Sequence, residues 1–369
     1  MVIISRTAWL YALVITLLVF QLPATAQTPE SSWLNIVRQT PYAESQGVAS
    51  NLATIRQWVL FGNGFCDEPR RHLLYDRRGR FLGYIESAET ASETIARLNT
   101  TRQRIVEEKN LTGWSPGSPG NSGYPFALSC DQPFVDIDEA ISRLTGAQEK
   151  YRLWGTWDNI SVGTPEDQVS LIELFKTVYR YRREQGRFSF SDSVLPTLLG
   201  KVIIESGGVQ DALSAASARG IMQLTPQVLQ DCNVPNRFRL HRIVQVDCAL
   251  RLMEQNHRNL QEPFTTVFGE LPRKKQSELY NLLLTQAYQV GVGRVTELLL
   301  DEELGRAAQY FAANQEQFSA MDILVGMIYH NLGRRDLGLR TLYYVTDINL
   351  AQQALCASTA MAGDPWCEP

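Results

Sequence analysis

Residues 201–226 read KVIIESGGVQDALSAASARGIMQLTP, and this stretch decides the predicted fold. The apolar residues that lead into it recur at helical spacing, which predicts a helix that carries Glu205 near its end. Glu205 follows Val202 by three residues and so lies close to the apolar stripe of that helix. Gly207 and Gly208 then end the helix. An acid at a helix C-terminus is unfavourable with respect to the helix dipole, so the position of Glu205 needs an explanation.

A single carboxyl group against an apolar wall suits a proton donor, because an apolar site favours the protonated form. Met222 can supply part of that wall. Gln223 offers a neutral donor and acceptor to a sugar hydroxyl or N-acetyl group without adding charge. The competing interpretations are an exposed helix-terminal acid without chemistry at Glu205 and ordinary core packing at Met222.

Glu205-Ser206, Ser214 and residues 217–226 together resemble the signature of the soluble lytic transglycosylases, which share a lysozyme-like fold with goose-type lysozymes. The family pattern is Glu-Ser, a loop with a serine, and then Gly-Ala-x-Gly-Leu-Met-Gln-x-x-Pro. Its spacing is reproduced here without a gap. Ser217 stands where the family usually has glycine, and an isoleucine replaces the usual leucine.

Residues 287–295, AYQVGVGRV, are similar to a second family element, Ala-Tyr-Asn-Ala-Gly-x-Gly-x-Val. Gln289 replaces the usual Asn and Val290 the usual Ala. Tyr288 offers a flat face for a sugar ring and a hydroxyl group that can hydrogen-bond to it. The resemblance covers roughly residues 190–300.

The resemblance implies that Glu205 alone carries the chemistry. In this family one Glu protonates the bond between N-acetylmuramic acid and N-acetylglucosamine in peptidoglycan, and the N-acetyl group of the substrate stabilises the charge at C1. The same Glu then takes the proton of the muramyl C6 hydroxyl, which closes a 1,6-anhydro ring without consuming water. Most glycosidases use a second carboxyl group, but the nearest acids in the sequence, Asp211 and Glu254, lie in no recognisable motif.

The other site residues fall into two groups. Contact with the substrate is expected of Ser214, Met222, Gln223, Tyr288 and Gln289. Ser206 is expected to make a structural hydrogen bond near the site, and Gly220 to let the backbone approach the substrate. Neither a metal nor a cofactor is expected, because the four histidines are scattered without zinc-ligand spacing.

The N-terminus predicts a cleaved secretory signal over residues 1–26. Arg6 supplies the positive charge, residues 8–20 the apolar run, and Ala24-Thr25-Ala26 the cleavage site. The apolar run is shorter than the roughly 20 residues of a membrane anchor, and no later stretch could span a bilayer. We therefore expect a periplasmic protein with no stable membrane span after removal of the signal. The formal net charge of −4 argues against a nucleic-acid partner.

Six cysteines follow the signal, and their even number in a secreted chain predicts disulfides. Sequence alone leaves the connectivity open. Because local loops close at lower entropic cost, we expect pairing between neighbours: Cys66 with Cys130, Cys232 with Cys248, and Cys356 with Cys367.

The expected architecture is mainly α. Residues 27–150 form an N-terminal α+β region of unknown fold, 151–190 a helical connector, 191–300 the lysozyme-like catalytic domain, and 301–369 a helical hairpin with a disulfide-tied tail. The main helix of the connector is expected to start at Thr164. In the N-terminal region the turn around Gly79 predicts a β-hairpin, followed by a polar helix from Thr90 to Lys109. Residues 320–345 resemble one tetratricopeptide unit, but no second copy is present, so a hairpin packed on the catalytic domain is the competing interpretation.

The sequence therefore favours a lytic transglycosylase that cleaves peptidoglycan strands. One alternative is a goose-type lysozyme that hydrolyses the same polymer. Another is a non-catalytic wall-binding scaffold of an envelope-spanning machine, in which the N-terminal or C-terminal extension binds envelope proteins.

Overall fold

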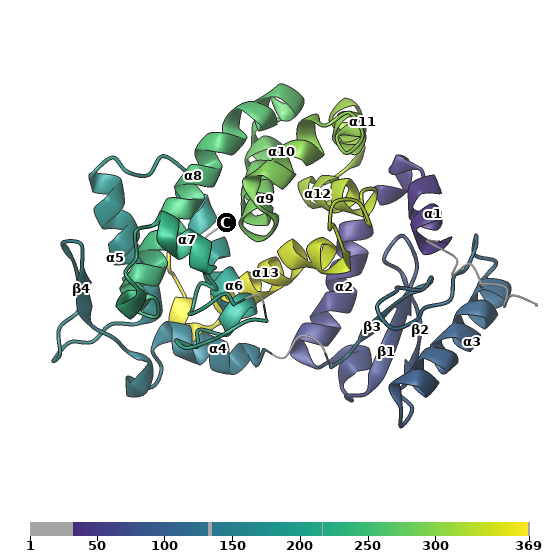
Figure 1. The fold of residues 1–369 in the computed structure, drawn as a ribbon, viewed down its shortest axis with the longest axis horizontal. Helices are drawn as coiled ribbons and strands as arrows, with labels where there is room; N and C mark the ends of the chain where they lie inside the picture. Colours follow the sequence, from purple (N-terminus) through teal and green to yellow (C-terminus); the bar gives the residue numbers. More distant parts are fainter. Residues whose placement is uncertain (1–31, 132–134, 216, 368–369) are drawn as a thin grey trace, which may run out of the picture.

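The computed structural model describes residues 32–131, 135–215 and 217–367 (Figure 1). The predicted signal over residues 1–26 lies outside this part of the chain. The fold is mainly helical with a small antiparallel sheet, as the sequence predicts. Within the described residues, no helix is both long and apolar enough to cross a membrane.

The N-terminal sheet has the strand order β2-β1-β3, and both pairings are antiparallel. Its strands are β1 (Arg71–Tyr75), β2 (Phe81–Glu86) and β3 (Phe126–Ser129). The predicted hairpin of β1 and β2 is therefore confirmed. Its turn forms because the carboxylate of Asp76 accepts hydrogen bonds from the backbone N–H groups of Arg78 and Arg80. Gly79 supplies the left-handed conformation, with φ of 70°, that the turn requires.

The two faces of this sheet bury different helices. Leu73 and Tyr75 point into the main core, whereas Leu74 packs with Leu98 and Ile105 of α3 (Ala91–Lys109) in a smaller cluster. α3 begins as predicted, because the hydroxyl of Thr90 accepts a hydrogen bond from the N–H of Glu93 in a capping box. Figure 1 shows α3 on one side of the sheet and α2 (Val48–Phe61) on the other.

The remaining helices form one body with a continuous buried core that runs from Val37 to Met361. They are α1 (Ser32–Gln39), α4 (Ile137–Thr145), α5 (Leu171–Glu184), α6 (Leu195–Ser206), α7 (Pro226–Asp231), α8 (Arg242–Phe268), α9 (Arg273–Val290), α10 (Val292–Leu300), α11 (Arg306–Ala313), α12 (Ala320–Tyr329) and α13 (Leu339–Ala357). α13 lies along α6 and α2 and also contacts α9 (Figure 1). The C-terminal helix therefore packs directly on the helix that carries Glu205.

The connector differs from its prediction as a helical segment. It contains a second hairpin, β4 (Gly155–Trp157) with β5 (Ile160–Val162). Asp158 and Asn159 form its turn with φ values of 46° and 63°, which is typical of a two-residue type I′ turn. Thr164 does not start a helix.

The helix of the connector, α5, begins after Ser170, whose hydroxyl accepts from the N–H of Glu173 at 3.1 Å. The hydroxyl of Thr164 accepts from the N–H of Asp167 and holds only a turn. Both residues have the same capping chemistry, but the apolar stripe that packs into the core starts at Leu171.

α8 continues past Pro263, a helix-breaking residue inside it, to Phe268. Leu260, Phe264 and Phe268 are buried at helical spacing and hold the extra turns against the core. Packing therefore outweighs the helix-breaking tendency of the proline.

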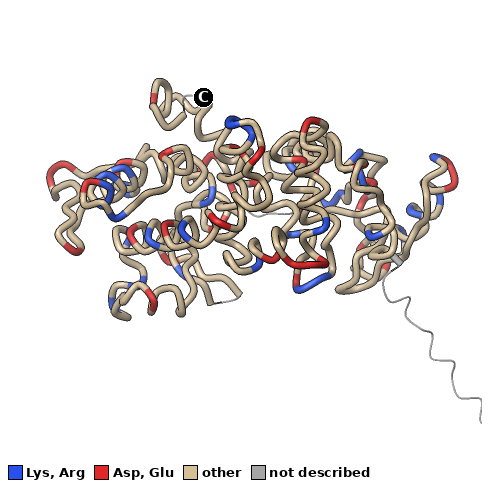
Figure 2. The backbone as a smooth tube through the Cα atoms, turned by 90° about the horizontal axis from the view of Figure 1, so that it is seen from above, with Lys and Arg blue, Asp and Glu red and all other residues tan. Residues whose placement is uncertain are grey.

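All three predicted disulfides are confirmed: Cys66–Cys130, Cys232–Cys248 and Cys356–Cys367. Each disulfide joins two cysteines that follow one another in the sequence, so the three loops do not overlap. Figure 2 shows acidic and basic residues interspersed along the molecule.

Candidate functional site

Glu205 lies in the last turn of α6. The helix carries Pro196 in its first turn, where its missing N–H is not needed. It ends at Gly207, whose φ of 58° is left-handed and whose N–H donates to the carbonyl of Ile203 at 3.0 Å. The side chain of Glu205 is 26% exposed, so its carboxyl group is fixed by neighbours and still reachable from solvent.

Two donors from different helices meet on a single oxygen of Glu205. The hydroxyl of Tyr344, on α13, donates to Oε1 at 2.9 Å. Nζ of Lys201, one turn earlier on α6, lies 3.3 Å from the same atom. Among the described residues no hydrogen bond reaches Oε2 of Glu205, and Oε1 is the oxygen of the closest approach to Lys201.

Lys201 is 1% exposed and is held by three contacts. Besides Glu205, its Nζ donates to the carbonyl of Met222 at 3.2 Å and lies 3.6 Å from the ring centroid of Tyr288. The hydroxyl of Tyr288 donates to the same carbonyl at 3.3 Å. Burial lowers the pKa of Lys201, and the charge of Glu205 and its hydrogen bond to the lysine oppose that effect.

Both tyrosines at the site keep their protons near neutral pH. Burial raises the pKa of Tyr344 well above its ordinary value, and the adjacent charge of Glu205 adds to the effect. Burial acts in the same direction on the pKa of Tyr288. Each hydroxyl group is therefore a stable hydrogen-bond donor.

Ser206 joins the end of α6 to the loop that precedes α7. Its hydroxyl donates to the carbonyl of Ile221 at 2.8 Å and accepts from the N–H of Gly208 at 3.1 Å. Further along the loop, the hydroxyl of Ser214 accepts from the N–H of Ala218 at 3.0 Å. In this structure both serines shape the backbone around Glu205.

The side chain of Gln223 stabilises the loop between α6 and α7 by hydrogen bonds to its backbone. Its amide nitrogen donates to the carbonyls of Ala212 at 3.1 Å and Gly220 at 2.9 Å, and its backbone is left-handed with φ of 48°. The amide oxygen has no partner among the described residues and remains able to accept a hydrogen bond. Both hydrogens of its amide nitrogen are therefore engaged by the protein, and only the oxygen is open to a ligand.

Met222 is 0% exposed, so its side chain belongs to the core and only its carbonyl belongs to the site. Gln289 is exposed, and its amide oxygen accepts from Nε2 of Gln286 at 2.7 Å. Of the residues expected to bind substrate, Tyr288 and Met222 are thus connected to Glu205 through Lys201. No hydrogen bond or ion pair joins Gln289 to that group within the described chain.

Gln245, which the sequence did not single out, supports the loop from α8. It is 1% exposed, its Oε1 accepts from the N–H of Met222 at 3.2 Å, and its amide nitrogen donates to the carbonyl of Arg239. A Cβ atom at Gly220 would lie 2.7 Å from Cδ of Gln245. In this structure the glycine therefore makes room for Gln245.

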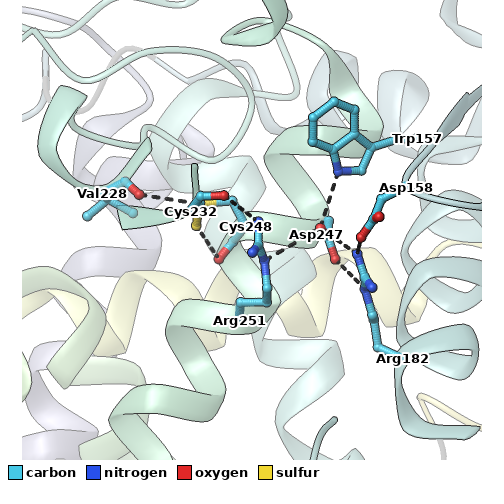
Figure 3. A network of polar contacts seen from close by, with 8 residues as sticks. All are labelled: Trp157, Asp158, Arg182, Val228, Cys232, Asp247, Cys248 and Arg251. Carbon is cyan, nitrogen blue, oxygen red and sulfur yellow. Dashed lines mark hydrogen bonds and ion pairs between the residues drawn. A yellow bond between two sulfur atoms is a disulfide. The ribbon is translucent and has the colours of Figure 1, made fainter. Parts of the chain in front are cut away.

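An ionic network around the buried Asp247 of α8 ties this helix to its neighbours (Figure 3). Asp247 is 0% exposed and accepts from Nε of Arg182 on α5 at 2.8 Å and from Nε1 of Trp157 on β4 at 3.3 Å. The guanidinium of Arg251 approaches the same carboxylate and also donates to the carbonyl of Cys232, beside the disulfide to Cys248. The helix that carries Gln245 is thus tied to α5, to the β4–β5 hairpin and to the segment after α7.

The two other acids considered from the sequence make no contact with Glu205 in the described chain. Asp211 is exposed. Glu254 is buried, which disfavours its charged form, but hydrogen bonds from Ser189 and Arg258 outweigh burial and lower its pKa. The described residues also contain no group of three or more His, Cys, Asp or Glu side chains that could hold a metal ion.

The sequence did not reveal either of the two partners of Glu205 found among the described residues, for different reasons. Lys201 carries a visible signal: it is a lysine inside the apolar run LLGKVII, four residues and thus about one helical turn before Glu205. Tyr344 carries none, because 139 residues separate it from Glu205 and only the packing of α13 on α6 brings them together.

Comparisons of this chain with models of protein families, with curated proteins and with solved structures find no match.

Proposed function

We propose that this chain is a lytic transglycosylase that cleaves the β-1,4 bond between N-acetylmuramic acid and N-acetylglucosamine in peptidoglycan and leaves 1,6-anhydromuramic acid ends. A lysozyme-like fold for residues 191–300 is part of the proposal. The observation that carries it is the carboxyl group of Glu205, which is partly exposed and, among the described residues, accepts a hydrogen bond at one oxygen only. The other oxygen is free to exchange a proton with a substrate.

In the proposed reaction Glu205 is the catalytic residue. Its carboxyl group gives a proton to the glycosidic oxygen while the bond from that oxygen to C1 breaks. The carboxylate then accepts the proton of the C6 hydroxyl, whose oxygen bonds to C1. The oxygen of Gln223 and the ring face of Tyr288 are the groups suited to contact the sugar.

The backbone of the loop supports the resemblance seen in the sequence. Ser217, which stands where the transglycosylase signature usually has glycine, adopts a left-handed φ of 61°. Glycine adopts this conformation without steric strain, so the preference of the signature agrees with the geometry at this position. Gly220 is likewise left-handed, with φ of 76°.

The lack of a second acid in a recognisable motif favours ring closure over hydrolysis in this proposal. An inverting glycosidase needs a second carboxylate to activate water, and a retaining one needs a second carboxylate as nucleophile. Such pairs lie about 5–9.5 Å apart, beyond direct contact, and neither Asp211 nor Glu254, the acids nearest to Glu205 in the sequence, lies in a recognisable motif. A substrate that supplies its own C6 hydroxyl needs no such group.

The proposed location is the periplasm, where peptidoglycan lies. The three disulfides support an oxidising compartment. The N-terminal region, residues 27–150, and the C-terminal extension, residues 301–369, are the proposed surfaces for envelope proteins.

Digestion of purified peptidoglycan by the mature chain tests the proposal, with mass spectrometry of the released muropeptides. Anhydro products, one water lighter than hydrolytic products, are expected. Glu205→Gln should abolish their release, whereas Asp211→Asn, the matched change at an exposed acid, should leave it intact. Reducing-end products would assign the chain to the hydrolases. Retention on insoluble peptidoglycan without any release would favour the scaffold.

A further inference from the structure

The two oxygens of the Glu205 carboxyl group lie in different surroundings. Oε1 accepts a hydrogen bond from the hydroxyl of Tyr344 at 2.9 Å and lies 3.3 Å from Nζ of Lys201, whereas no hydrogen bond reaches Oε2 among the described residues. We propose that Lys201 and Tyr344 are positioning residues that anchor Oε1 and thereby make Oε2 the oxygen that exchanges the proton with the substrate. This inference rests on the proposed function and adds two residues that lie outside the motifs of its signature.

We refer to Lys201 and Tyr344 together as the anchor. Their hydrogen-bonding capacity explains why they bind one particular oxygen of Glu205. Lys201 in its charged form can only donate, and Tyr344, whose pKa burial raises, keeps its proton and donates as well. Both groups therefore require Oε1 to act as an acceptor. When the carboxyl group is protonated, its proton is best placed on Oε2, where no donor competes.

The anchor is rigid because each of its members is held by other contacts. Lys201 is fixed by the carbonyl of Met222 and by the ring of Tyr288. Tyr344 is 6% exposed and lies on α13, which packs along α6. Its position is set by a helix far along the chain, so the site is incomplete without α13.

The charges around the carboxyl group determine how the anchor responds to pH. Lys201 and Tyr344 contact Glu205 directly, and Tyr288 from α9 lies behind Lys201. From α4, the guanidinium of Arg143 donates to the carbonyl of Gly207 and pairs with Glu139. Lys201 is thus the positive charge in contact with the Glu205 carboxylate among the described residues.

The anchor contributes to both halves of the reaction. In the first half the Oε2–H bond breaks, the proton goes to the glycosidic oxygen, and the electron pair of the C1–O bond leaves with that oxygen. Lys201 then opposes the negative charge that appears on Glu205. In the second half Oε2 takes the proton of the C6 hydroxyl as its oxygen bonds to C1, which restores the carboxyl group.

Tyr344→Phe is the first test, because it removes one hydroxyl and keeps the ring. The matched control is Tyr343→Phe, the neighbouring residue on α13, whose hydroxyl contacts that of Tyr75 and not Glu205. With soluble glycan strands as substrate, Tyr344→Phe should lower kcat about tenfold to hundredfold with KM changed less than about twofold. Tyr343→Phe should leave kcat within about twofold of the unmodified protein.

Lys201→Met is the second test, and its readout is the pH profile of kcat. Loss of the positive charge favours the protonated form of the Glu205 carboxyl group, so the alkaline limb of the profile should move to higher pH. A residue with only a structural role would lower activity without moving that limb. The same displacement should appear when the Glu205 carboxyl is titrated by carbon-13 NMR without substrate, with Glu205→Gln used to assign its signal.

The outcomes separate this inference from the proposed function. Anhydro products from the unmodified chain, together with unchanged kcat and pH profiles in Tyr344→Phe and Lys201→Met, would overturn the positioning roles and leave the function standing. Absence of products from the unmodified chain would reject the function. The NMR titration of the Glu205 carboxyl group would then test the anchor independently of activity. Identical titrations in the unmodified protein, Tyr344→Phe and Lys201→Met would reject the anchor.

Discussion

Arg56 and Asp347 form an ion pair in the interior of the protein, with Nε 2.6 Å from Oδ1 and Nη2 2.7 Å from Oδ2. Their side chains are 5% and 10% exposed. The pair joins α2, near the N-terminus, to α13, near the C-terminus. Asp347 lies one helical turn after Tyr344, so this pair fixes the part of α13 that reaches Glu205.

Arg56→Met should destabilise the protein by about 3–5 kcal/mol, because it leaves the carboxylate of Asp347 buried without its partner. Burial already raises the pKa of Asp347, although Arg56 opposes this. Urea unfolding followed by circular dichroism measures the change. Adding Asp347→Leu should recover part of the loss, since the unpaired charge is then gone.

The control for this prediction is Arg104→Met. Arg104 pairs with Glu108 at 4.0 Å on the surface of α3, and both side chains are more than half exposed. Its removal should change stability by less than about 0.5 kcal/mol. Equal losses in Arg56→Met and Arg104→Met would show that the buried pair does not hold α13.

Gly220→Ala should destabilise the loop next to Glu205 for two reasons. The left-handed φ of 76° disfavours a side chain by about 1–2 kcal/mol, and the new Cβ would lie 2.7 Å from Gln245. Overpacking of this kind adds about 1–3 kcal/mol.

Gly120→Ala isolates the backbone part of that effect. Gly120 has the same φ of 76°, and a Cβ atom there would meet nothing within 4 Å. The difference in the free energy of unfolding between the two alanine variants measures the clash with Gln245. Equal losses would mean that Gln245 moves aside freely and does not brace Met222.

The features predicted from the sequence are those that depend on neighbouring residues. The β1–β2 hairpin follows from the turn around Gly79, and α3 follows from its capping box at Thr90. The disulfides follow from the order of the cysteines, because each cysteine pairs with the next one along the chain. Thr164 shows the limit of such signals: its capping chemistry is right, but only Leu171 begins a stripe that the core buries. The β4–β5 hairpin was detectable in principle from Asp158 and Asn159.

The residues of the candidate site also fall into two groups, those within short sequence motifs and those brought in by helix packing. Glu205, Met222 and Tyr288 were found because short motifs contain them. Tyr344 and Gln245 contact the site through the packing of α13 and α8, and no local pattern reveals which side of a long helix faces a loop elsewhere in the chain. The sequence predicts apolar side chains around Glu205, but in the structure two polar groups, from Lys201 and Tyr344, contact its Oε1.

Removal of a disulfide should destabilise the protein more when the bond closes a longer loop. In the chain-entropy description, replacing both cysteines of Cys66–Cys130 by serine should cost about 4 kcal/mol, and the same change at Cys232–Cys248 or Cys356–Cys367 about 3 kcal/mol. The sequence separations are 64, 16 and 11 residues. Denaturant unfolding of the three double variants gives the ranking. A larger loss for either short loop than for Cys66–Cys130 would contradict it.

His330 should make the protein sensitive to mild acid. Burial, with a smaller contribution from Arg334, lowers the pKa of His330 to about 4, and its ring nitrogen lies 3.1 Å from the hydroxyl of Ser45 in the core. The ordinary pKa of an exposed histidine is about 6.5, so between about pH 6.5 and pH 4 the unfolded chain binds a proton that the folded chain does not. Stability is therefore retained above this range and lost as the pH falls through it, by about 3 kcal/mol in total.

His330→Gln checks this, because glutamine stays neutral and can still hydrogen-bond to Ser45. Urea unfolding at about pH 7 and about pH 4 gives the acid-induced loss of stability for each protein. The loss should be about 3 kcal/mol smaller in the variant, since all other titrating groups are shared. His72→Gln, at a half-buried histidine of the N-terminal sheet, should give a smaller difference because its ring is less buried. Parallel acid losses in the unmodified protein and His330→Gln would show that the buried ring is protonated without unfolding the core.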